Sequence, residues 1–499
     1  MSLFEDLTPD ISYDIVRDLL SEYREHSTQE IAEWEALYNN ATSPFLPRTM
    51  DRLSVEYRKQ AWTPIAYAKM IVDAWAAGLY GRQGPVERST GVEEWDAKMP
   101  WPQMPRLMLR VARVASITGN DVIRLRPGFP DKIIYADMGP GNAVAITDPQ
   151  DPHGDIIGVV YDYMADTVEA QVSRYSHGNK QAQHVVEIVT RHVRDASGDI
   201  IIPGIHRKFV DDELVPQDDE GYNPLGDYLD CVWWRNKDHP TDANGASDVE
   251  PLFRLFKALN ETYTDLQELG KWNLWPMLVT NTVGRPEISY TPRAIVQLAE
   301  ETADGKAPDL KRLDWGGNVL YPFIKYVENL TMVMHQTSKV PSVAVGDLKN
   351  ISQLSSGRAL EVTMQPYLSE LGERERVAIE QEKQLMETTV AMMAYSDIIK
   401  GVSGPDMKAI RAKMEPSVTF PPYRLPKNYN DEASRHVQLR GAGLITLKRS
   451  LEERYPDWTD DEIAEELEQL RPDEPEVQDA ANINRIKAAQ ERIRNAEQE

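Results

Sequence analysis

The sequence predicts an α+β protein in which helices predominate, and three observations carry this prediction. Amphipathic helical patterns run through residues 8–77, 247–273 and 319–340. Short β-rich runs separated by turn residues fill residues 121–232. One further helical pattern, residues 355–396, is long enough for a rod of about 60 Å at 1.5 Å per residue.

Composition and charge limit the possible classes of protein. The 499 residues are 41% hydrophobic and 27% charged, which is typical of a folded chain with roughly two to four structural units. The chain has 55 basic and 80 acidic residues, so its net charge is -25. Such a surface disfavours wrapping by nucleic acid, yet it allows DNA to slide through a channel that does not grip the phosphates.

The cysteine count and the lengths of the apolar runs indicate in which cellular compartment the protein is expected. Cys231 is alone, so no intrachain disulfide can form, and a reducing environment fits. The N-terminal residues lack the apolar core of a secretory signal, and no apolar run reaches the roughly 18 residues that span a bilayer. We therefore expect an intracellular soluble protein that has no membrane partner.

The N-terminal half, residues 1–246, reads as helices followed by a β-rich part. Residues 62–79 form an apolar pattern that predicts a buried helix, and a second helix is predicted over residues 104–117. His184 and His192 fall on one face of a predicted strand, but no third ligand lies at metal-binding spacing. We therefore expect no metal site and no cofactor.

After a polar linker, two predicted helices flank a short-stranded excursion. Ser247 and Glu250 form a capping box in front of the first helix, residues 247–273. Residues 274–318 are mixed and turn-rich, residues 319–340 return as a helix, and residues 341–354 form a loop. The two helices carry the apolar residues Leu252, Leu255, Phe256, Leu259, Tyr263, Ile324 and Val327.

The long helix has an unusual middle. Pro366 and Gly372 predict a kink, because proline removes a backbone donor and glycine loosens the next turn. Residues 373–384 carry Glu, Arg, Lys and Gln on nearly every face, so no single core is expected to cover them. The pattern predicts that this stretch crosses a wet gap or a subunit boundary.

The C-terminal half resembles the portal proteins of tailed double-stranded DNA bacteriophages, in particular the siphophage type. Three stretches carry the resemblance: GASDVEPLFRLFKALNETYTDL, VPSVAVGDLKNISQLSSGRALEVTMQPYLSEL and LRGAGLITLKRSLEERYPDWTDDEIAEELEQL. They cover about half the chain, from about Asn236 onward, and their specificity lies in order and spacing.

The resemblance implies a portal architecture with wing, stem, clip and crown around a central channel. It assigns residues 1–246 to the wing, 247–273 and 319–340 to two stem helices, and 274–318 to the clip. It assigns 341–354 to a tunnel loop, 355–430 to a long kinked helix and further wing, and 431–499 to the crown and C-terminal tail.

The resemblance also implies roles for individual residues. Those of the tunnel loop would face DNA, and those of the clip would face the packaging motor and later the tail adaptor. The implied tunnel-loop residues are Val343, Gly346, Asp347, Leu348, Lys349, Asn350 and Ser352, and the implied clip residues are Arg285, Glu287, Tyr290 and Arg293.

By the same resemblance, the chain would be a head-tail connector. It would form a homo-oligomeric ring, usually a dodecamer, at one capsid vertex of the virion, after assembly in the host cytoplasm. DNA packaging and DNA ejection would both pass through the ring. The implied partners are other copies of the chain, double-stranded DNA, the terminase large subunit, the major capsid and scaffold proteins, and a head-completion or tail adaptor protein.

Enzyme signatures are absent from the sequence. It holds no GxxxxGK or GxGxxG phosphate-binding loop, no HExxH, no paired CxxC and no GxSxG turn, so we expect no catalytic residues. Its many carboxylates and 11 Trp leave a carbohydrate-active hydrolase open as an alternative. A structural ring or adaptor protein without a DNA channel is the other alternative.

Overall fold

A computed structural model describes most of the chain as two compact units. Unit 1 comprises Met1–Leu354 and Leu360–Tyr423, and unit 2 comprises Ser355–Ala359 and Arg424–Glu499. The structure is 52% helical and 21% strand, in agreement with the predicted α+β class. The described residues are 7–24, 28–40, 64–82, 84–128, 132–148, 151–166, 182–194, 197–216, 220–239, 244–274, 277–280, 310–313, 320–346, 357–399, 406–423, 436–455 and 458–470.

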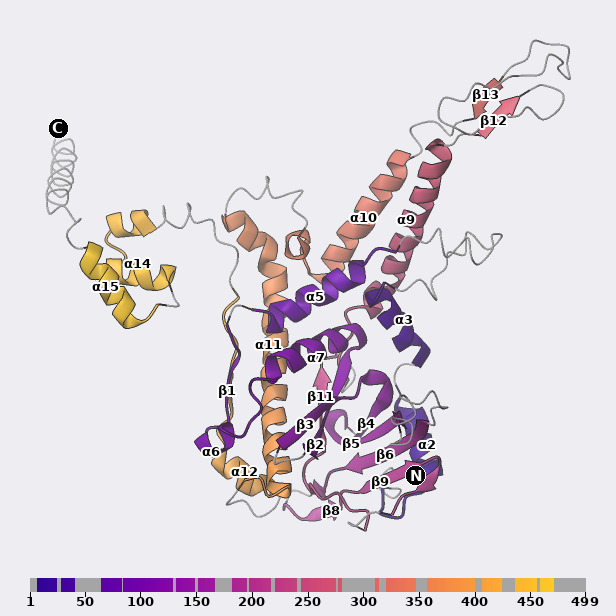
Figure 1. Ribbon diagram of the computed structural model, residues 1–499, viewed down its shortest axis with the longest axis vertical. Coiled ribbons are helices and arrows are strands. Elements are labelled where there is room, and N and C mark those ends of the chain that lie inside the picture. The colour runs from indigo at the N-terminus through magenta and orange to yellow at the C-terminus, as the bar shows by residue number, and fades with distance from the viewer. Residues whose placement is uncertain are drawn as a thin grey trace, which may run out of the picture. The chain divides into compact units, whose positions relative to one another are not determined.

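A five-stranded antiparallel sheet forms the larger part of the β-rich region (Figure 1). One of its faces is covered by helix α2 (Tyr13–Tyr23), whose Val16 and Leu19 are buried against Val160 and Ile188. In sheet order the strands are β10 (Glu213–Leu214), β9 (His206–Val210), β6 (Ala182–Thr190), β5 (Asp151–Asp166) and β4 (Ala143–Asp148).

A three-stranded sheet covers the other face. Its order is β11 (Cys231–Arg235), β2 (Asn120–Gly128) and β3 (Lys132–Asp137), with antiparallel pairing throughout. Val122 and Trp233 from this sheet share a buried cluster with Tyr161 from β5. Because both faces of the larger sheet are covered, its strands are apolar on both sides, as the continuous β-rich runs of the sequence indicate.

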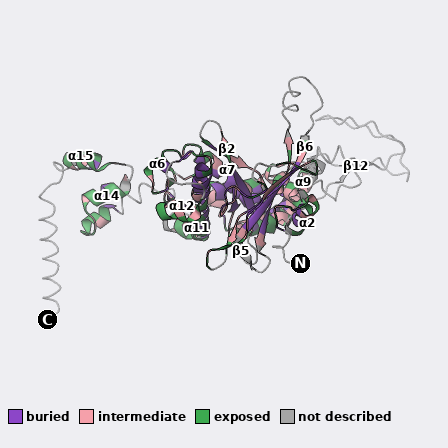
Figure 2. Cartoon of the chain, turned by 90° about the horizontal axis from the view of Figure 1, so that it is seen from below, coloured by how far each residue is buried: buried purple, intermediate pink, exposed green. Residues whose placement is uncertain are grey.

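Helices α3 (Thr28–Tyr38), α5 (Tyr67–Tyr80) and α7 (Met104–Thr118) lie beside the sheets. Figure 1 shows α5 and α7 next to the long helix α11, and Figure 2 shows buried residues concentrated around α7 and the sheet strands. The predicted helices at 62–79 and 104–117 are thus confirmed in their described parts.

The contact between α5 and α11 (Gly357–Tyr395) is close. Trp75 stacks on Tyr367 with ring centroids 4.5 Å apart, and the Tyr367 hydroxyl donates a hydrogen bond to the Ala74 carbonyl at 2.7 Å. A Cβ on Gly78 would lie 2.1 Å from that hydroxyl oxygen. Glycine at position 78 therefore lets the two helices approach each other.

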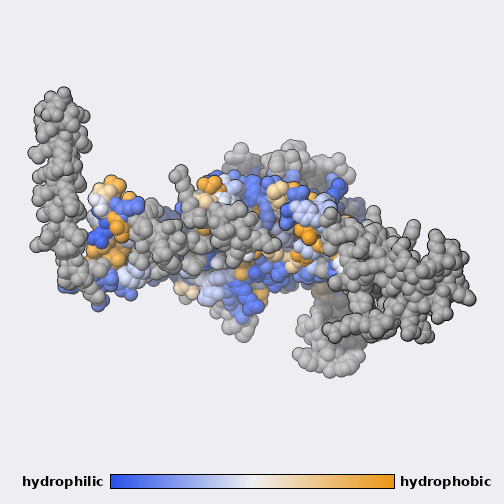
Figure 3. Space-filling view, turned by 90° about the horizontal axis from the view of Figure 1, so that it is seen from above, coloured by the Kyte–Doolittle hydropathy of each residue, from blue (hydrophilic) through white to orange (hydrophobic). Residues whose placement is uncertain are grey.

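Short elements complete unit 1. Strands β1 (Glu87–Ser89) and β14 (Ser417–Thr419) pair and so join two distant parts of the sequence. The remaining elements outside the stem are α6 (Glu93–Asp96), η2 (Pro140–Asn142), β7 (Val193–Arg194), β8 (Ile200–Ile202) and α12 (Met407–Lys413). On the face seen in Figure 3, hydrophobic residues reach the surface in separate patches among hydrophilic ones.

The long helix is confirmed, with bounds within two residues of the predicted 355–396. Pro366 lies inside it, and in Figure 1 its first turns are inclined to the rest, in agreement with the predicted kink. The predicted wet crossing in its middle is wrong, because Arg374, Gln381 and Glu382 are no more than 3% exposed. Each of these three side chains bonds a residue from elsewhere in the chain: Arg374 bonds Asp248, Gln381 bonds the Arg235 backbone, and Glu382 accepts from Arg88 and Tyr80.

Unit 2 is a small helical body. Residues 436–441 are helical and precede α14 (Leu447–Arg454) and α15 (Asp460–Leu470). A capping box is present at the start of α15: the Thr459 amide donates to Glu462 Oε2 at 2.7 Å, and the Glu462 amide donates to Thr459 Oγ1 at 3.4 Å. The part of the implied crown and C-terminal tail beyond residue 470 lies outside the described residues.

None of the helices in the described ranges carries an apolar stretch that would suffice to cross a bilayer.

A buried carboxyl pair in the three-stranded sheet yields a test of the fold. Asp121 is fully buried, and its main-chain neighbour Val122 donates to its Oδ1 at 2.8 Å. Burial, followed by the charge of Asp137, raises the pKa of Asp121 well above 3.8. The folded chain therefore keeps a proton on Asp121 that the unfolded chain releases above its ordinary pKa.

We expect Asp121→Asn to increase stability at neutral pH. In the native chain, the free energy of unfolding falls as pH rises above about 4, because only the folded state retains this proton. The Asn side chain keeps the bond to Val122 and does not titrate, so the stability of the variant relative to the native chain should increase from pH 5 to pH 8. Urea unfolding at both pH values measures this, with exposed Asp14→Asn as the control that should change neither value. A loss of stability in Asp121→Asn at pH 8 would contradict the assignment.

Candidate functional site

Two antiparallel helices form the candidate stem. Helix α9 (Phe253–Leu274) leads out to strand β12 (Met277–Thr280), and strand β13 (Leu310–Leu313) leads back to helix α10 (Leu320–Ser338). The strands pair in antiparallel register, with Met277 opposite Leu313. Figure 1 shows the helices side by side, ending at this hairpin, which is the order of elements that the sequence predicts.

The predicted stem residues divide between the interior and the surface. Leu252, Phe256 and Leu259 are buried, Val327 is 7% exposed, and Leu255 and Tyr263 are half-buried. Leu252 lies in a 3-10 turn, η3 (Glu250–Leu252), immediately before α9. Ile324 is 44% exposed and lies on the outer surface of α10.

Helix α10 is apolar on more than its buried side. Val327, Leu330 and Met334 form the buried stripe at helical spacing. At 100° per residue, one exposed flank begins beside this stripe at Ile324 and extends to Tyr321 and Met332 on the side that faces away from it. The other flank carries Tyr326 and Val333. Their exposed fractions are Tyr321 63%, Ile324 44%, Tyr326 50%, Met332 50% and Val333 39%. A partner in addition to α9 would be needed to cover these flanks.

The residues just before α9, 247–252, form the root of that helix, and a buried ion pair holds them in place. Arg374 on α11 donates to both carboxylate oxygens of Asp248, at 2.6 and 2.8 Å, and its guanidinium lies 4.0 Å from the Trp75 ring centroid. Burial by itself would raise the pKa of Asp248, but the Arg374 charge outweighs it and holds that pKa well below its usual range. Ser116 and Lys237 also contact the carboxylate, at 2.6 and 3.2 Å.

Ser247 sets the start of this root. Its Oγ accepts hydrogen bonds from the amides of Val249 and Glu250, at 3.0 and 3.1 Å, which is the serine half of the predicted capping box. The same hydroxyl donates to the Ile117 carbonyl of α7 at 2.5 Å. The cap therefore also fixes the stem to the body of unit 1.

The C-terminal end of α10, together with Lys339 and Val340 that follow it, forms the root of that helix and contacts the same turn of α11. Lys339 ends the helix with a φ of 57°, and its Nζ lies 2.6 Å from Glu370 Oε2. Glu370 is one helical turn from Arg374 and lies 3.5 Å from it. His335 links this end of α10 to α5 as well, because its Nε2 bonds the Tyr67 hydroxyl at 2.5 Å. Its Nδ1 bonds the Val340 carbonyl at 2.7 Å.

A cavity of about 900 Å³ lies at this junction of α5, α9, α10 and α11. Its walls include Tyr67, Tyr263, Met332, His335 and Pro366. The mixed apolar and polar lining suits a protein segment rather than a charged small molecule.

The predicted tunnel loop is only partly described. Val343 lies half-buried in a 3-10 turn, η4 (Ser342–Val345), against α5. Gly346 ends this turn, is exposed and has a φ of 84°, a conformation that glycine adopts without strain. The residues outside the described ranges are Asp347, Leu348, Lys349, Asn350 and Ser352 of the loop and Arg285, Glu287, Tyr290 and Arg293 of the predicted clip.

Sequence reasoning missed the ion pairs that hold both stem roots. A signal was present, because Glu370 and Arg374 occur three and seven residues after Tyr367, on the apolar stripe of the long helix. A charged side chain on such a stripe must be paired if the stripe is buried. The identity of Asp248 and Lys339 as partners depends on the fold.

A second buried network joins the two sheets. Arg124 of β2 binds both carboxylate oxygens of Glu187 on β6, at 2.6 and 2.8 Å, and Asp230 at 2.6 Å. His206 bonds Glu187 at 2.8 Å, and Tyr161 donates to Asp230 at 2.7 Å. Since these groups satisfy one another, we interpret the network as structural.

Comparisons with known proteins found likenesses among solved structures. No family model matches the chain, and no curated protein matches it. Three matching structures are each 11% identical to it: the neck of a native GTA particle computed with C12 symmetry, the virion of a native gene transfer agent (GTA) particle, and the neck of an empty GTA particle computed with C6 symmetry.

These matches cover most of each chain, but the structures superpose poorly. They cover 82%, 84% and 84% of this chain and 93%, 98% and 98% of the matched chains, in the same order. The TM-scores are 0.37, 0.35 and 0.40.

The stem anchor yields a quantitative test. Arg374→Met keeps most of the side-chain volume but removes the closer of the two cations at buried Asp248, whose charge Lys237 at 3.2 Å then compensates only in part. We therefore expect a loss of about 3 kcal/mol of unfolding free energy. Arg411→Met breaks the Arg411–Glu387 pair, whose arginine is 58% exposed, and should cost less than about 1 kcal/mol.

Adding Asp248→Asn to Arg374→Met should restore part of the loss, because the uncompensated charge is then removed. Urea unfolding of the variants measures all three effects. Equal losses in the Arg374 and Arg411 variants would contradict the importance of this anchor.

Proposed function

We propose that the chain is a portal subunit, a structural component of a phage-like head that acts as its head-tail connector. In this proposal, copies of the chain form a homo-oligomeric ring, a dodecamer, at one capsid vertex. Double-stranded DNA passes through its channel during packaging and ejection. The stem, the hairpin at its tip and the loop that follows α10 keep the roles that the sequence resemblance implies.

The observation that carries this proposal is the exposed apolar surface of α10. Two exposed apolar flanks lie on either side of the stripe that α9 covers. A helix with uncovered apolar residues on two flanks can be in contact with two neighbours at once. Repetition of one such contact around an axis gives a closed ring when the rotation closes.

The charge of the chain is compatible with a conduit. A net charge of -25 favours repulsion of the phosphate backbone over adhesion to it. In the proposed channel, Lys349 is the basic group of the tunnel loop that would contact phosphates transiently. DNA could then move in either direction without release from a tight complex.

In this proposal the chain performs no catalysis. The sequence offers no nucleotide-binding loop, so the energy for packaging would come from a separate motor, the terminase large subunit, docked on the clip. The major capsid and scaffold proteins and a head-completion or tail adaptor protein are the other proposed partners. The exposed flanks of α10 would serve a ring without a DNA channel equally well, and the width of the central opening separates these two functions. No specific observation from the described residues favours the hydrolase.

The native mass of the purified chain tests this function. Light scattering on a sizing column should give a particle near twelve times the 56.7 kDa chain. A double variant, Tyr321→Ser with Tyr326→Ser, removes one apolar side chain from each exposed flank and should shift the mass toward the monomer. Its circular dichroism should stay unchanged, since both side chains are at least half exposed.

Met164→Ser provides the matched control, because Met164 is an equally exposed apolar residue that lies on β5 rather than the stem. It should leave the mass unchanged. If the stem variant and the control gave the same oligomer as the native chain, α10 would not be the ring contact. A native chain that stayed monomeric at high concentration and hydrolysed a polysaccharide would contradict the portal function itself.

A further inference from the structure

Strand β11 has an open edge. Among the described residues it pairs with β2 only, and β2 lies between β11 and β3. The Asp230 carbonyl accepts a hydrogen bond from the Leu125 amide at 2.7 Å, and the Asn236 amide donates to the Gly119 carbonyl at 2.8 Å. The backbone groups of both residues therefore point toward β2. Because backbone groups alternate along an antiparallel pair, those of Cys231, Trp233 and Arg235 face away from β2.

At one end of this edge, a side chain of helix α11 makes the backbone hydrogen bonds that a neighbouring strand would make. With its amide oriented to satisfy both groups, Gln381 donates to the Arg235 carbonyl at 3.2 Å and accepts from the Arg235 amide at 2.8 Å. Gln381 is 3% exposed, so this contact is buried. No described side chain bonds the backbone of Cys231 or Trp233 in this way, so a single side chain completes only part of the edge.

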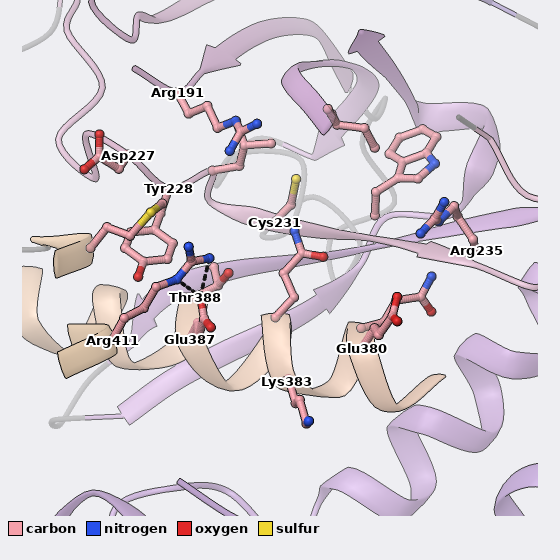
Figure 4. A pocket seen from close by; sticks show the side chains of 16 residues that line it. Arg191, Asp227, Tyr228, Cys231, Arg235, Glu380, Lys383, Glu387, Thr388 and Arg411 are labelled. Atoms are coloured by element: carbon pink, nitrogen blue, oxygen red, sulfur yellow. Dashed lines mark hydrogen bonds and ion pairs between the residues drawn. The ribbon is translucent and has the colours of Figure 1, made fainter. Parts of the chain in front are cut away.

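Beyond Gln381 the edge borders a cavity of about 400 Å³, between β11, α11 and α12. This volume lies within the usual range of ligand sites. Figure 4 shows Tyr228 on one wall, beside the Arg411–Glu387 pair, and Arg191 on the wall above. Cys231 and Trp233 also line the cavity.

Two donors of the lining lack an acceptor. The Tyr228 hydroxyl and the Trp233 indole N–H are buried without a hydrogen-bond partner, and the two residues are only 6% and 9% exposed. An indole N–H can only donate, so Trp233 needs an acceptor that the described part of the chain does not supply. Unsatisfied buried donors are rare in native folds.

Two of the three acidic groups of the lining already have partners. Arg411 donates to Glu387 at 3.0 Å, and Arg194 donates to both carboxylate oxygens of Asp227, at 2.8 and 3.1 Å. The third, Glu380, is exposed and lies near Arg235 at the other end of the cavity (Figure 4). The Tyr228 end of the cavity therefore has a donor to offer and few free acceptors. An occupant rich in carbonyl and carboxylate oxygens fits it best.

We propose that this cavity binds an extended peptide segment with acidic side chains, supplied by a partner protein. The segment adds as a strand to the open edge of β11, where its backbone pairs with Cys231 and Trp233. Its carbonyl or carboxylate oxygens accept from Tyr228 and from the Trp233 indole. This inference is independent of the proposed ring, because every residue that it uses lies within one chain.

The probe is the blocked pentapeptide acetyl-VEVEV-amide, titrated into the full chain by calorimetry. Two further peptides separate the required features: acetyl-VKVKV-amide reverses the charge, and acetyl-VEPEV-amide removes a backbone donor at the strand centre. We expect VEVEV to bind and to slow hydrogen exchange in the fragment that contains β11 at least tenfold. The other two peptides should bind at least tenfold more weakly.

Tyr228→Phe removes one unpartnered hydroxyl at nearly constant volume. We expect it to weaken VEVEV binding about tenfold while the melting temperature of the free chain stays equal or rises, because the hydroxyl has no partner there. Tyr222→Phe, at a 44% exposed tyrosine outside the cavity lining, is the matched control and should change neither value.

Three results would overturn the proposal. Absence of VEVEV binding together with a lower melting temperature for Tyr228→Phe would mean that water alone satisfies the hydroxyl. Equal affinity for VEVEV and VEPEV would exclude strand addition. Slower exchange of the β11 fragment at higher concentrations of the chain alone, without peptide, would assign the edge to a second copy and not to a partner protein.

Discussion

The buried pairing of Arg374 with Asp248 is the constraint on which the stem depends. Removal of two charges from water costs several kcal/mol per ion, and only close contact with additional hydrogen bonds offsets that cost. Here the carboxylate receives bonds from Arg374, Ser116 and Asn236. Any displacement of the α9 root relative to α11 would separate these groups, so the two elements must move together.

The two stem roots are held with different strength. Asp248 and Arg374 are almost completely buried, whereas the Lys339 side chain that pairs with Glu370 is 53% exposed. Salt and solvent weaken the exposed pair far more than the buried one. Of these two ion pairs, the one at α9 is therefore the stronger, although His335 also links the α10 root to Tyr67. In the proposed portal, movement of the α10 root would be passed on to the loop that follows it.

The sequence predicted the helical elements well because their information is local. The two stem helices and the long helix each follow an apolar stripe. Helix α9 begins six residues inside the predicted range because the Ser247 cap is followed by a 3-10 turn, residues 250–252. The polar middle of α11 was misinterpreted for the opposite reason. The partners of Arg374 and Glu382 lie more than 100 residues away, so the helix pattern alone could not show that these charges are buried. The cavity beside β11 likewise depends on where α11 lies against the strand edge, and no local pattern reports this.

In the proposed function, copies of this chain surround a channel that admits DNA. Electron microscopy of the purified protein, averaged over end-on views, would show whether such a channel exists. We expect a closed ring, twelvefold when all subunits assemble, with a central opening wide enough for a B-form duplex. A ring whose centre is closed or too narrow for a duplex would contradict the conduit and favour a channel-free adaptor. Particles without rotational symmetry would contradict the ring itself.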